Sequence, residues 1–496
     1  MALPTLPNRL ARSTARAWAL ALAGAAFVAY CAIGTAEVHL GSGDYWEHLA
    51  AMRAFWERPG SPAHPHFGTD EPSHLLTPYH LFWALAARTF GVEPVAVLPV
   101  AAGCNAALLL WAMRRLGRWL AGTASAAPVY ALTLLLFWYA PWSWSGFHAL
   151  GLLPIMASYP YWFALPLALG VLASVGVRSS LAVVALAALA VPLVFLCHPL
   201  TGAYLCGALV LKALLGAPDA GLRERARILS PVLALPAALL WPYFPVWDAI
   251  AASPDYAALG FSGDYRKFYS ALPQRLAPAA LGLLALPFVP APFPRRWLVG
   301  GIASLAAVYA RNYGALHSGV LGRSVAFLIL SLHLALATAV WTGLQQAGRR
   351  TVTAVLFGGA LLLFGAFQVR DSVRWFSFGE GGPQREDLGP LTRLIGPEDV
   401  VLAPAEWAWW LPGLTGSRVA STLRPTPFMH DFAQRQVDVD AFFARGTSPT
   451  RRAAVARRYG ATYVLVPAAL TPPPIAGATL AEVHPAFALY RIEPER

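Results

Sequence analysis

Apolar segments of membrane-spanning length alternate with short polar segments along most of the chain. A helix rises 1.5 Å per residue, so about 20 apolar residues cross the hydrocarbon core of a bilayer. This pattern predicts an α-helical polytopic membrane domain over residues 1–370, with about 11 transmembrane helices. The eleven stretches lie at 17–36, 94–113, 124–140, 160–176, 180–197, 200–216, 228–247, 276–293, 297–313, 320–343 and 352–369.

Composition supports a membrane protein. Of the 496 residues, 57% are hydrophobic and only 12% are charged, against about a quarter charged in a typical soluble domain. A soluble chain of this size cannot bury so much apolar surface. The four cysteines all lie in apolar runs, which excludes a disulfide framework. The net charge of +12 is spread over the loops, so we expect contact with membrane lipids and no nucleic-acid partner.

The last part of the chain has a different character. Residues 371–496 carry 26 charged residues, whereas the 370 residues before them carry 36. Short Val-rich runs at 399–405 and 461–467 predict strands, and helical spacing at 430–446 and 448–460 predicts two helices. Residues 478–493 are typical of a closing hairpin. We therefore expect a small C-terminal α/β domain.

Charge also predicts orientation. With the N-terminus in the cytoplasm, fifteen basic residues of 1–370 lie in inside segments and eight in outside segments, as the positive-inside rule requires. An odd number of spans then makes the C-terminal domain extracytoplasmic. Ten of the twelve acidic residues in 1–370 fall on the outer side, which indicates either solvation or carboxylate chemistry there.

The first outer loop, 37–92, holds the strongest candidate chemistry. Asp44 follows the Gly41–Gly43 turn at the expected start of an amphipathic helix, with Glu47 three positions later, as in a capping box. The aromatic stripe of this helix is suited to the membrane interface, and a second helical stretch runs from 75 to 90. His48 shares a helical face with Asp44. We expect Asp44 and His48 to be catalytic; the alternative is that Asp44 is only a helix cap.

A divalent cation is a further expectation for this loop. Carboxylates are ligands of Mg²⁺ and Mn²⁺. The candidate ligands have no fixed spacing that identifies a metal motif; they are Asp44, Glu47, Asp70 and Glu71.

Polar residues in the other outer loops complete the candidate set. His198 lies at a Pro-containing break between two apolar runs, and a His at membrane depth typically lines a cavity. Arg323 begins an apolar run, where a guanidinium is suited to clamping a phosphate and the alternative is snorkelling to the headgroups. The remaining candidates are His148, Asp264 and Tyr265 for the cavity, and Arg311, Arg266 and Lys267 for phosphate. The loop around His148, at 139–162, is rich in aromatics typical either of a membrane belt or of a carbohydrate-stacking surface.

The segment GSGDYWEHLAAMRAF, together with the predicted layout, resembles the GT-C superfamily of membrane glycosyltransferases. The resemblance implies a polyprenyl-phosphate-linked sugar as donor, with Asp44 on the essential acidic position and Arg323 at the lipid phosphate. RRYGATYVLV, near the end of the chain, is similar to a segment of many such bacterial proteins. The chain has no WWD-type motif, because Trp407-Ala408-Trp409-Trp410 is not followed by an acid.

These observations predict a hexosyl- or pentosyltransferase in a bacterial inner membrane. It transfers a sugar on the outer face to a glycan, lipid or protein acceptor. Two alternatives stay open, namely a non-catalytic polysaccharide-assembly subunit and a lipid-linked glycan transporter or flippase. A transporter should show an internal repeat and deeply buried charges, and the sequence shows no evident repeat.

Overall fold

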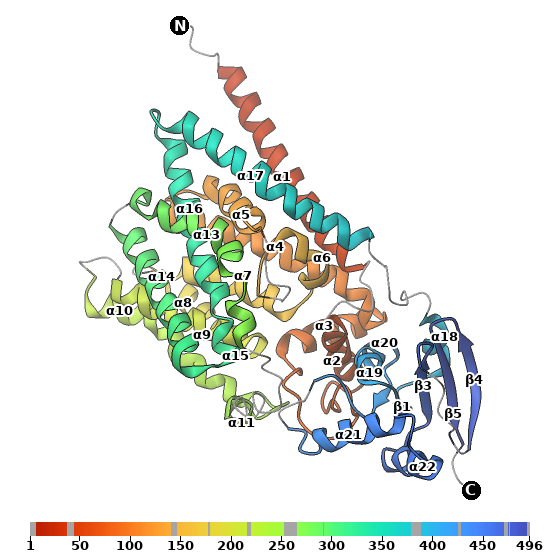
Figure 1. The fold of residues 1–496 in the computed structure, drawn as a ribbon. Helices are drawn as coiled ribbons and strands as arrows, with labels where there is room; N and C mark the ends of the chain where they lie inside the picture. Colours follow the sequence, from red (N-terminus) through yellow and green to blue (C-terminus); the bar gives the residue numbers. More distant parts are fainter. Residues whose placement is uncertain are drawn as a thin grey trace.

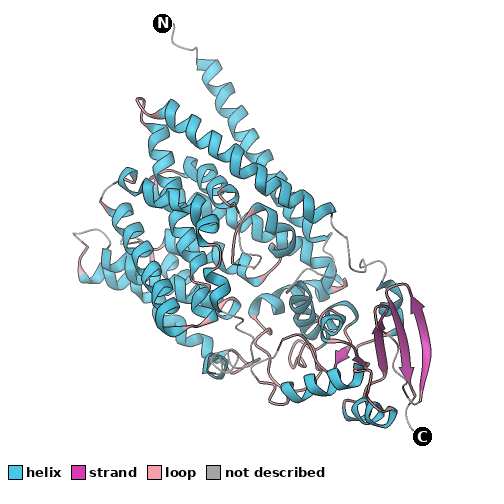
Figure 2. Ribbon diagram, viewed as in Figure 1, coloured by secondary structure: helices cyan, strands magenta, loops and turns pink. Residues whose placement is uncertain are grey.

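The computed structural model of the chain is a helical assembly with a small mixed sheet at the C-terminal end (Figures 1 and 2). It describes residues 6–36, 44–139, 146–176, 179–215, 220–251, 265–290, 292–377, 388–424, 428–470, 475 and 477–493. Asp264 lies outside these residues. The helical part and the mixed sheet confirm the expected fold class of a membrane helical domain with a C-terminal α/β region.

Each of the eleven apolar stretches forms helical structure. The elements are α1 (Leu6–Ala36), α4 (Pro94–Leu120), α5 (Ala127–Leu136), α7 (Pro160–Ser174), α8 (Leu181–Cys197), α9 (Pro199–Leu215), the 3₁₀ segment η3 (Ser230–Leu240), α13 (Leu272–Ala285), α14 (Phe293–Arg311), α16 (Val325–Gln345) and α17 (Arg350–Ser377). Shorter pieces join them: η1 (Ala124–Ala126), η2 (Leu150–Leu152), α6 (Leu153–Met156), α10 (Leu222–Leu229), α11 (Val246–Ala251), η4 (Tyr265–Tyr269), η5 (Leu286–Phe288), the π-helical turn η6 (Asn312–Leu316) and α15 (Gly319–Gly322).

Four helices are long and apolar enough to cross a bilayer, among the residues that the structure describes. They are Ala17–Ala36, Pro94–Leu120, Gly319–Gln345 and Arg350–Val373. Leu150–Met156 and Pro160–Ser174 make a fifth span if this pair, bent by 119°, crosses as one. The chain is therefore a membrane protein, and the count of eleven spans stays a prediction.

Two helices of the first outer loop lie between the membrane helices and the sheet (Figure 1). They are α2 (Tyr45–Glu57) and α3 (Pro78–Phe90). Thr77 precedes Pro78, whose fixed φ favours the first turn of a helix, and Gly91 ends α3 at a φ of 64°. The aromatic stripe of α2 is buried in protein, because Trp46 and Phe55 are 1% and 0% exposed and α2 packs on α3, α4 and α20. The aromatic stripe of α2 therefore packs against protein and does not face lipid as expected, while the position of α2 at the membrane interface stays a prediction.

The C-terminal region folds around a five-stranded sheet of order β2-β1-β3-β5-β4. The strands are β1 (Val400–Leu402), β2 (Arg418–Val419), β3 (Tyr463–Pro467), β4 (Ala478–His484) and β5 (Phe487–Ile492). The helices are α18 (Gly389–Leu394), α19 (Ala405–Ala408), α20 (Leu411–Thr415), α21 (Phe432–Phe443) and α22 (Pro449–Arg458). β1 pairs in parallel with β2 and β3, while β5 pairs antiparallel with β3 and β4. The expected strands, helices and hairpin are all present.

The first outer loop is bound directly to this C-terminal region. Arg53 of α2 donates hydrogen bonds to the carbonyls of Gly413 (2.6 Å) and Leu414 (3.1 Å) near the end of α20. The Val419 N–H of β2 donates to the His66 carbonyl at 2.8 Å. These contacts hold the segment after β2 against the start of α2.

Candidate functional site

Asp44 lies at the start of α2, but its side chain makes no capping hydrogen bond. Its Oδ1 atom lies 2.5 Å from Nη1 of Arg424, in the C-terminal region. The expected capping box is therefore absent, and the alternative that Asp44 serves only as a cap was wrong. The carboxylate instead takes part in an ion pair between the first outer loop and the C-terminal region.

Glu47 binds the same guanidinium. Its Oε2 lies 3.2 Å from Nη1 of Arg424, and the guanidinium lies over the ring of Trp409 at 4.3 Å from the centroid. Burial raises the pKa of Glu47 to about 8; Arg424 opposes this shift and Asp44 adds to it. Burial lowers the pKa of Arg424, but the two carboxylates outweigh it, so the net shift is upward. A proton on Glu47 near neutral pH leaves Asp44 as the main counter-ion of Arg424.

Sequence reasoning missed Arg424 and Trp409. Arg424 lies outside regular secondary structure, shortly after β2, and no motif surrounds it in the sequence. Trp409 belongs to the segment Trp407-Ala408-Trp409-Trp410, whose only sequence signal was its partial likeness to a WWD-type motif. The outward surplus of acids in the membrane part was the only available signal, because clustered carboxylates need a cation when they are buried.

His48 points to a different partner from the one expected. Its Nδ1 lies 3.1 Å from Nε2 of His80, and its ring contacts Tyr159 edge-on at a centroid distance of 4.6 Å. Burial lowers the pKa of His48 to about 3, with smaller contributions in the same direction from Arg424, His198 and His74. His48 is therefore neutral and belongs to the same electrostatic neighbourhood as Arg424.

His74 and Arg323 belong to the electrostatic neighbourhood of Arg424. Both residues are exposed. Desolvation by the surrounding protein is the largest influence on the pKa of His74 and lowers it to about 4, followed by the charge of Arg424. Arg323 interacts electrostatically with both Asp44 and Arg424, so its charge acts on the same ion pair.

The other expected phosphate ligands lie on neighbouring elements. Arg266 and Lys267 are exposed on η4, which packs on α15, directly before Arg323. Phe268 lies against Gly322 in this contact. Tyr265 contacts the ring of His317 at 4.7 Å, and Arg311 is exposed at the end of α14. Asn312 fixes the turn that follows Arg311, because its side-chain amide donates to the Ser318 carbonyl and accepts from the Ser318 N–H.

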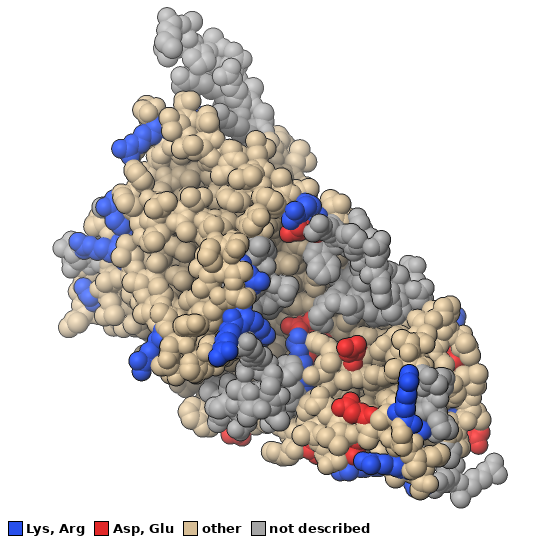
Figure 3. All heavy atoms as spheres, viewed as in Figure 1, with Lys and Arg blue, Asp and Glu red and all other residues tan. Residues whose placement is uncertain are grey.

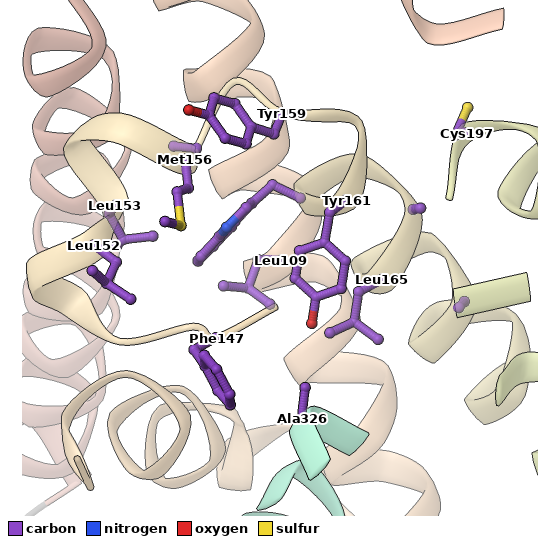
Figure 4. Close-up of a cluster of buried hydrophobic side chains, with 14 of the residues drawn as sticks. Leu109, Phe147, Leu152, Leu153, Met156, Tyr159, Tyr161, Leu165, Cys197 and Ala326 are labelled. Atoms are coloured by element: carbon purple, nitrogen blue, oxygen red, sulfur yellow. The ribbon is translucent and has the colours of Figure 1, made fainter. Parts of the chain in front are cut away.

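The expected cavity-lining histidines differ in their surroundings. His198 is half-buried between α8 and α9; its Nδ1 lies 2.7 Å from the Thr201 hydroxyl, and it interacts electrostatically with Arg323. His148 is 2% exposed and packs against Trp162 at 4.1 Å between centroids. Figure 4 shows its neighbour Phe147 in the same cluster of buried hydrophobic side chains as Leu152, Leu153 and Met156. Residues 146–162 are therefore mostly buried core. Residues 140–145 of the expected aromatic belt or stacking surface, with Trp142 and Trp144, lie outside the described residues, so that expectation stays a prediction for them.

The described residues do not fit a preformed divalent-cation site. No group of three or more His, Cys, Asp or Glu side chains among them is arranged to hold a metal ion. Asp44 and Glu47 bind Arg424, while Asp70 and Glu71 are exposed. Arg424 supplies the positive charge that the Asp44 and Glu47 carboxylates need, so we assign no step of the reaction to a divalent cation.

Charge is distributed unevenly over the surface. In the face drawn in Figure 3, the helical part is largely uncharged, whereas Asp and Glu side chains gather toward the C-terminal region. This distribution agrees with a membrane-embedded helical part and a water-facing region around α2 and the sheet.

The fold is similar to several solved structures. ArnT from Cupriavidus metallidurans superposes with a TM-score of 0.58 and 14% identity over 97% of this chain and 100% of its own. Arabinofuranosyltransferase AftD from Mycobacteria gives 0.57 and 16% over 97% of this chain but only 40% of its own length. The Archaeoglobus fulgidus oligosaccharyltransferase gives 0.54 and 12%, over 90% of this chain and 69% of its own. No protein-family model and no curated protein matches the sequence.

These structures belong to the GT-C superfamily of glycosyltransferases. The chain therefore has the GT-C fold, and the resemblance expected from the first outer loop is confirmed at the level of fold. ArnT has also been solved with bound undecaprenyl phosphate, and the archaeal enzyme with a dolichol-phosphate and an inhibitory peptide.

Proposed function

We propose that this protein is a glycosyltransferase that moves a hexosyl or pentosyl group from a polyprenyl-phosphate carrier to a hydroxyl of a glycan, lipid or protein acceptor. One observation carries the proposal: in a GT-C fold, Asp44 and Glu47 pair with Arg424, and the charge of Arg323 interacts with those of Asp44 and Arg424. An anionic lipid headgroup and a nucleophilic hydroxyl need this combination of a cation and a carboxylate.

Asp44 and Arg323 act at the two bonds of the sugar C1 atom that change, the bond that forms and the bond that breaks. Asp44 accepts the proton of the acceptor hydroxyl as its oxygen bonds to C1 of the sugar. The bond from C1 to the phosphate oxygen breaks, and its electron pair leaves with the lipid phosphate. Arg323 stabilises that charge, because a guanidinium fork pairs well with phosphate oxygens.

Arg424 has a second part in this scheme. The guanidinium fixes the direction of the Asp44 carboxylate before the substrates enter. The oxygen that pairs with Arg424 becomes available to the acceptor hydroxyl when that ion pair loosens. Entry of the donor phosphate supplies an alternative anion for Arg424.

The deciding experiment is a transfer assay with a radiolabelled polyprenyl-phosphate sugar and the Asp44→Asn variant. Asn retains the size of Asp and cannot accept the proton. We expect turnover to fall by about 10²- to 10⁴-fold while the protein remains folded. Asp70→Asn, an exposed change in the same loop, is the matched control. Near-native transfer by Asp44→Asn would refute the mechanism.

We place the reaction on the extracytoplasmic face of a bacterial inner membrane, with the N-terminus in the cytoplasm. The fifteen-to-eight division of basic residues supports this orientation. A reporter that is active only outside the cytoplasm should be active after Glu495 and inactive after Gln346. The reverse result would show that the candidate site lies on the cytoplasmic face.

A further inference from the structure

A small polar pocket lies between α2 and the C-terminal region. Its walls come from the second half of α2, from the turn that follows α2, and from residues between 397 and 418 of the C-terminal region. Its volume is about 40 Å³, whereas one water molecule needs about 10–15 Å³. The pocket therefore has room for a polar group of a few atoms, such as a carboxylate.

Arg53, the first of three arginines in the pocket wall, is already engaged by the protein. Its Nε and Nη2 atoms donate to the carbonyls of Gly413 and Leu414. Its Nη1 atom lies 2.8 Å from Oε2 of Glu93. All three guanidinium nitrogens thus have a protein partner, and Arg53 joins α2 to the C-terminal region.

The other two arginines, Arg58 and Arg418, share one carboxylate. Oε2 of Glu398 lies 3.1 Å from Nη2 of Arg418, and Oε1 lies 4.0 Å from Nη2 of Arg58. The Glu398 side chain is 80% exposed, and an ion pair so exposed contributes little to stability. The space between these two guanidinium groups therefore accepts a carboxylate, and the carboxylate that lies there is held weakly.

The backbone of the first outer loop keeps the Arg418 side chain in place. Gly68 has a φ of 64°, and a Cβ atom there would overlap Cδ and Nε of Arg418. The Arg418 side chain is only 29% exposed, although its partner Glu398 is open to water. Because little side-chain freedom is left to lose, the Arg418 guanidinium is preorganised for an anion.

Two further side chains set the charge of the pocket. Glu57 lies in its wall, where a Cβ atom on Gly416 would be 3.2 Å from Oε1 of Glu57. His64 also lines the pocket, and burial lowers its pKa well below the usual value, so His64 adds no charge. The three arginines against Glu57 and Glu398 leave a formal net charge of +1. The pocket therefore favours an anion, and Glu57 can accept hydrogen bonds from hydroxyl groups beside it.

The pocket lies along the same side of α2 as Glu47. Ala50 and Glu57, which line it, follow Glu47 by three and ten positions, and this spacing places them on one helical face. That face is turned to the C-terminal region at both places. At 1.5 Å per residue, the pocket extends from about 9 Å to about 20 Å beyond Asp44 along the helix. A ligand that reacts at Asp44 reaches the pocket when it is longer than one sugar.

We propose that this pocket binds the carboxylate of an acidic sugar in the acceptor glycan, and that Glu398 occupies the place of this carboxylate until the acceptor binds. The inference rests on the proposed function and narrows the acceptor to a glycan with an acidic sugar beyond the one that reacts. Arg58 and Arg418 pair with the carboxylate from two sides. Glu57 accepts hydrogen bonds from hydroxyls of the same sugar, and the side chain of Glu398 moves into water.

Three variants separate a ligand site from an ion pair that serves only the fold. Arg418→Gln and Arg58→Gln each remove one guanidinium group. Glu398→Gln removes the competing carboxylate and leaves both arginines. Because Arg58 and Glu398 are 60% and 80% exposed, their two variants should fold even if Arg418→Gln does not. Arg451→Gln, an exposed change in α22 away from the pocket, is the matched control.

The first measurement is the binding of single sugars to the full-length protein in micelles, followed by saturation-transfer difference NMR. Glucuronate should bind, whereas glucose, which has no charge, should not. We expect the Kd of glucuronate to rise about 10-fold in Arg418→Gln and less in Arg58→Gln. It should fall about 2- to 5-fold in Glu398→Gln and stay unchanged in Arg451→Gln.

Several results would overturn the proposal. Equal binding of glucuronate and glucose would show that the charge is not recognised. Acetate or glucose 6-phosphate that binds as tightly as glucuronate would exclude a site for a sugar carboxylate. A Kd of glucuronate that Glu398→Gln does not lower would show that Glu398 does not occupy the place of the ligand.

The second measurement is transfer to glycan extracted from the cell envelope. Arg418→Gln should raise the acceptor KM by about 10-fold and leave the donor KM unchanged. Chemical reduction of the glycan carboxylates to hydroxyls should raise the acceptor KM of the unmodified protein similarly. An acceptor KM that neither change alters would refute the acceptor role. A protein that binds glucuronate as expected but transfers no sugar would refute the proposed function and leave the carboxylate pocket supported.

Discussion

Nη1 of Arg424 lies 2.5 Å from Oδ1 of Asp44, so an arginine of the C-terminal region neutralises the carboxylate at the start of α2. The same nitrogen contacts Glu47 at 3.2 Å. The C-terminal region is thus part of the candidate site and not a separate appendage. Side chains from three separate segments meet there, because the Arg424 guanidinium also lies over the ring of Trp409.

This geometry predicts how Arg424 variants rank in transfer activity and in stability. Both carboxylates contact one nitrogen, so an ammonium can replace part of the ion pair. We expect Arg424→Gln to lose transfer activity by at least about 10-fold and about 2 kcal/mol of stability, and Arg424→Lys to retain more of both. Transfer rates and thermal melting measure the two effects. Equal activity in Gln, Lys and unmodified proteins would show that the ion pair has no part in the reaction.

Glu47 predicts an unusual dependence of stability on pH. Its pKa is raised in the folded state from 4.5 to about 8, chiefly by burial, so folding favours its protonated form. Its stabilising contribution is complete below pH 4.5 and is lost as the pH rises through 8. Relative to Glu47→Gln, the unmodified protein should melt a few degrees lower at pH 8 than at pH 5.

The Glu47 comparison must be made as a difference between the two proteins. His48 and His74 have lowered pKa values because the surrounding protein desolvates them, and they destabilise the fold as the pH falls below 6.5. Both proteins share that effect, so it cancels. Parallel melting curves for Glu47→Gln and the unmodified protein across this range would contradict the raised pKa.

The sequence predicted the elements whose signals are local. α22 begins where Ser448 and Pro449 predict, and the Ser448 hydroxyl accepts from Arg451 N–H at 3.3 Å. The predicted hairpin is present as β4 and β5. β2 was missed because it has only two residues, and their conformation depends on pairing with β1 and with the His66 carbonyl.

The candidate site likewise has residues with local sequence signals and residues whose positions depend on contacts between remote segments. Asp44 was found because a turn and a helix start mark it, whereas the position of Arg424 depends on how β2 and α20 dock against α2. Periodicity identified the apolar stripe on α2, including Trp46, but it could not distinguish a lipid surface from α20. Contacts between segments remote in sequence carry no local pattern.

The docking of α20 on α2 gives a further prediction. A Cβ atom on Gly413 would lie 2.7 Å from the carbonyl oxygen of Trp46, which is closer than van der Waals contact permits. Gly413→Ala should therefore separate the two helices and destabilise the protein by about 1–3 kcal/mol, with a loss of transfer activity. Gly446→Ala is the matched control, since a Cβ there meets no atom within 4 Å. A Gly413→Ala protein as stable and active as Gly446→Ala would show that close packing here is not needed.

Arg323 should be sensitive to the shape of its charged group as well as to its charge. Its charge interacts with those of Asp44 and Arg424, and a planar guanidinium can donate two parallel hydrogen bonds to a phosphate. Lysine retains the charge but offers a single rotating ammonium. We expect Arg323→Lys to raise the donor KM by about 10-fold with a smaller change in kcat, and Arg323→Ala to raise it further. Arg350→Lys, an exposed arginine at the start of α17, controls for a general effect on membrane insertion. If Lys serves as well as Arg while Ala does not, Arg323 acts as a point charge, and the bidentate contact with phosphate is refuted.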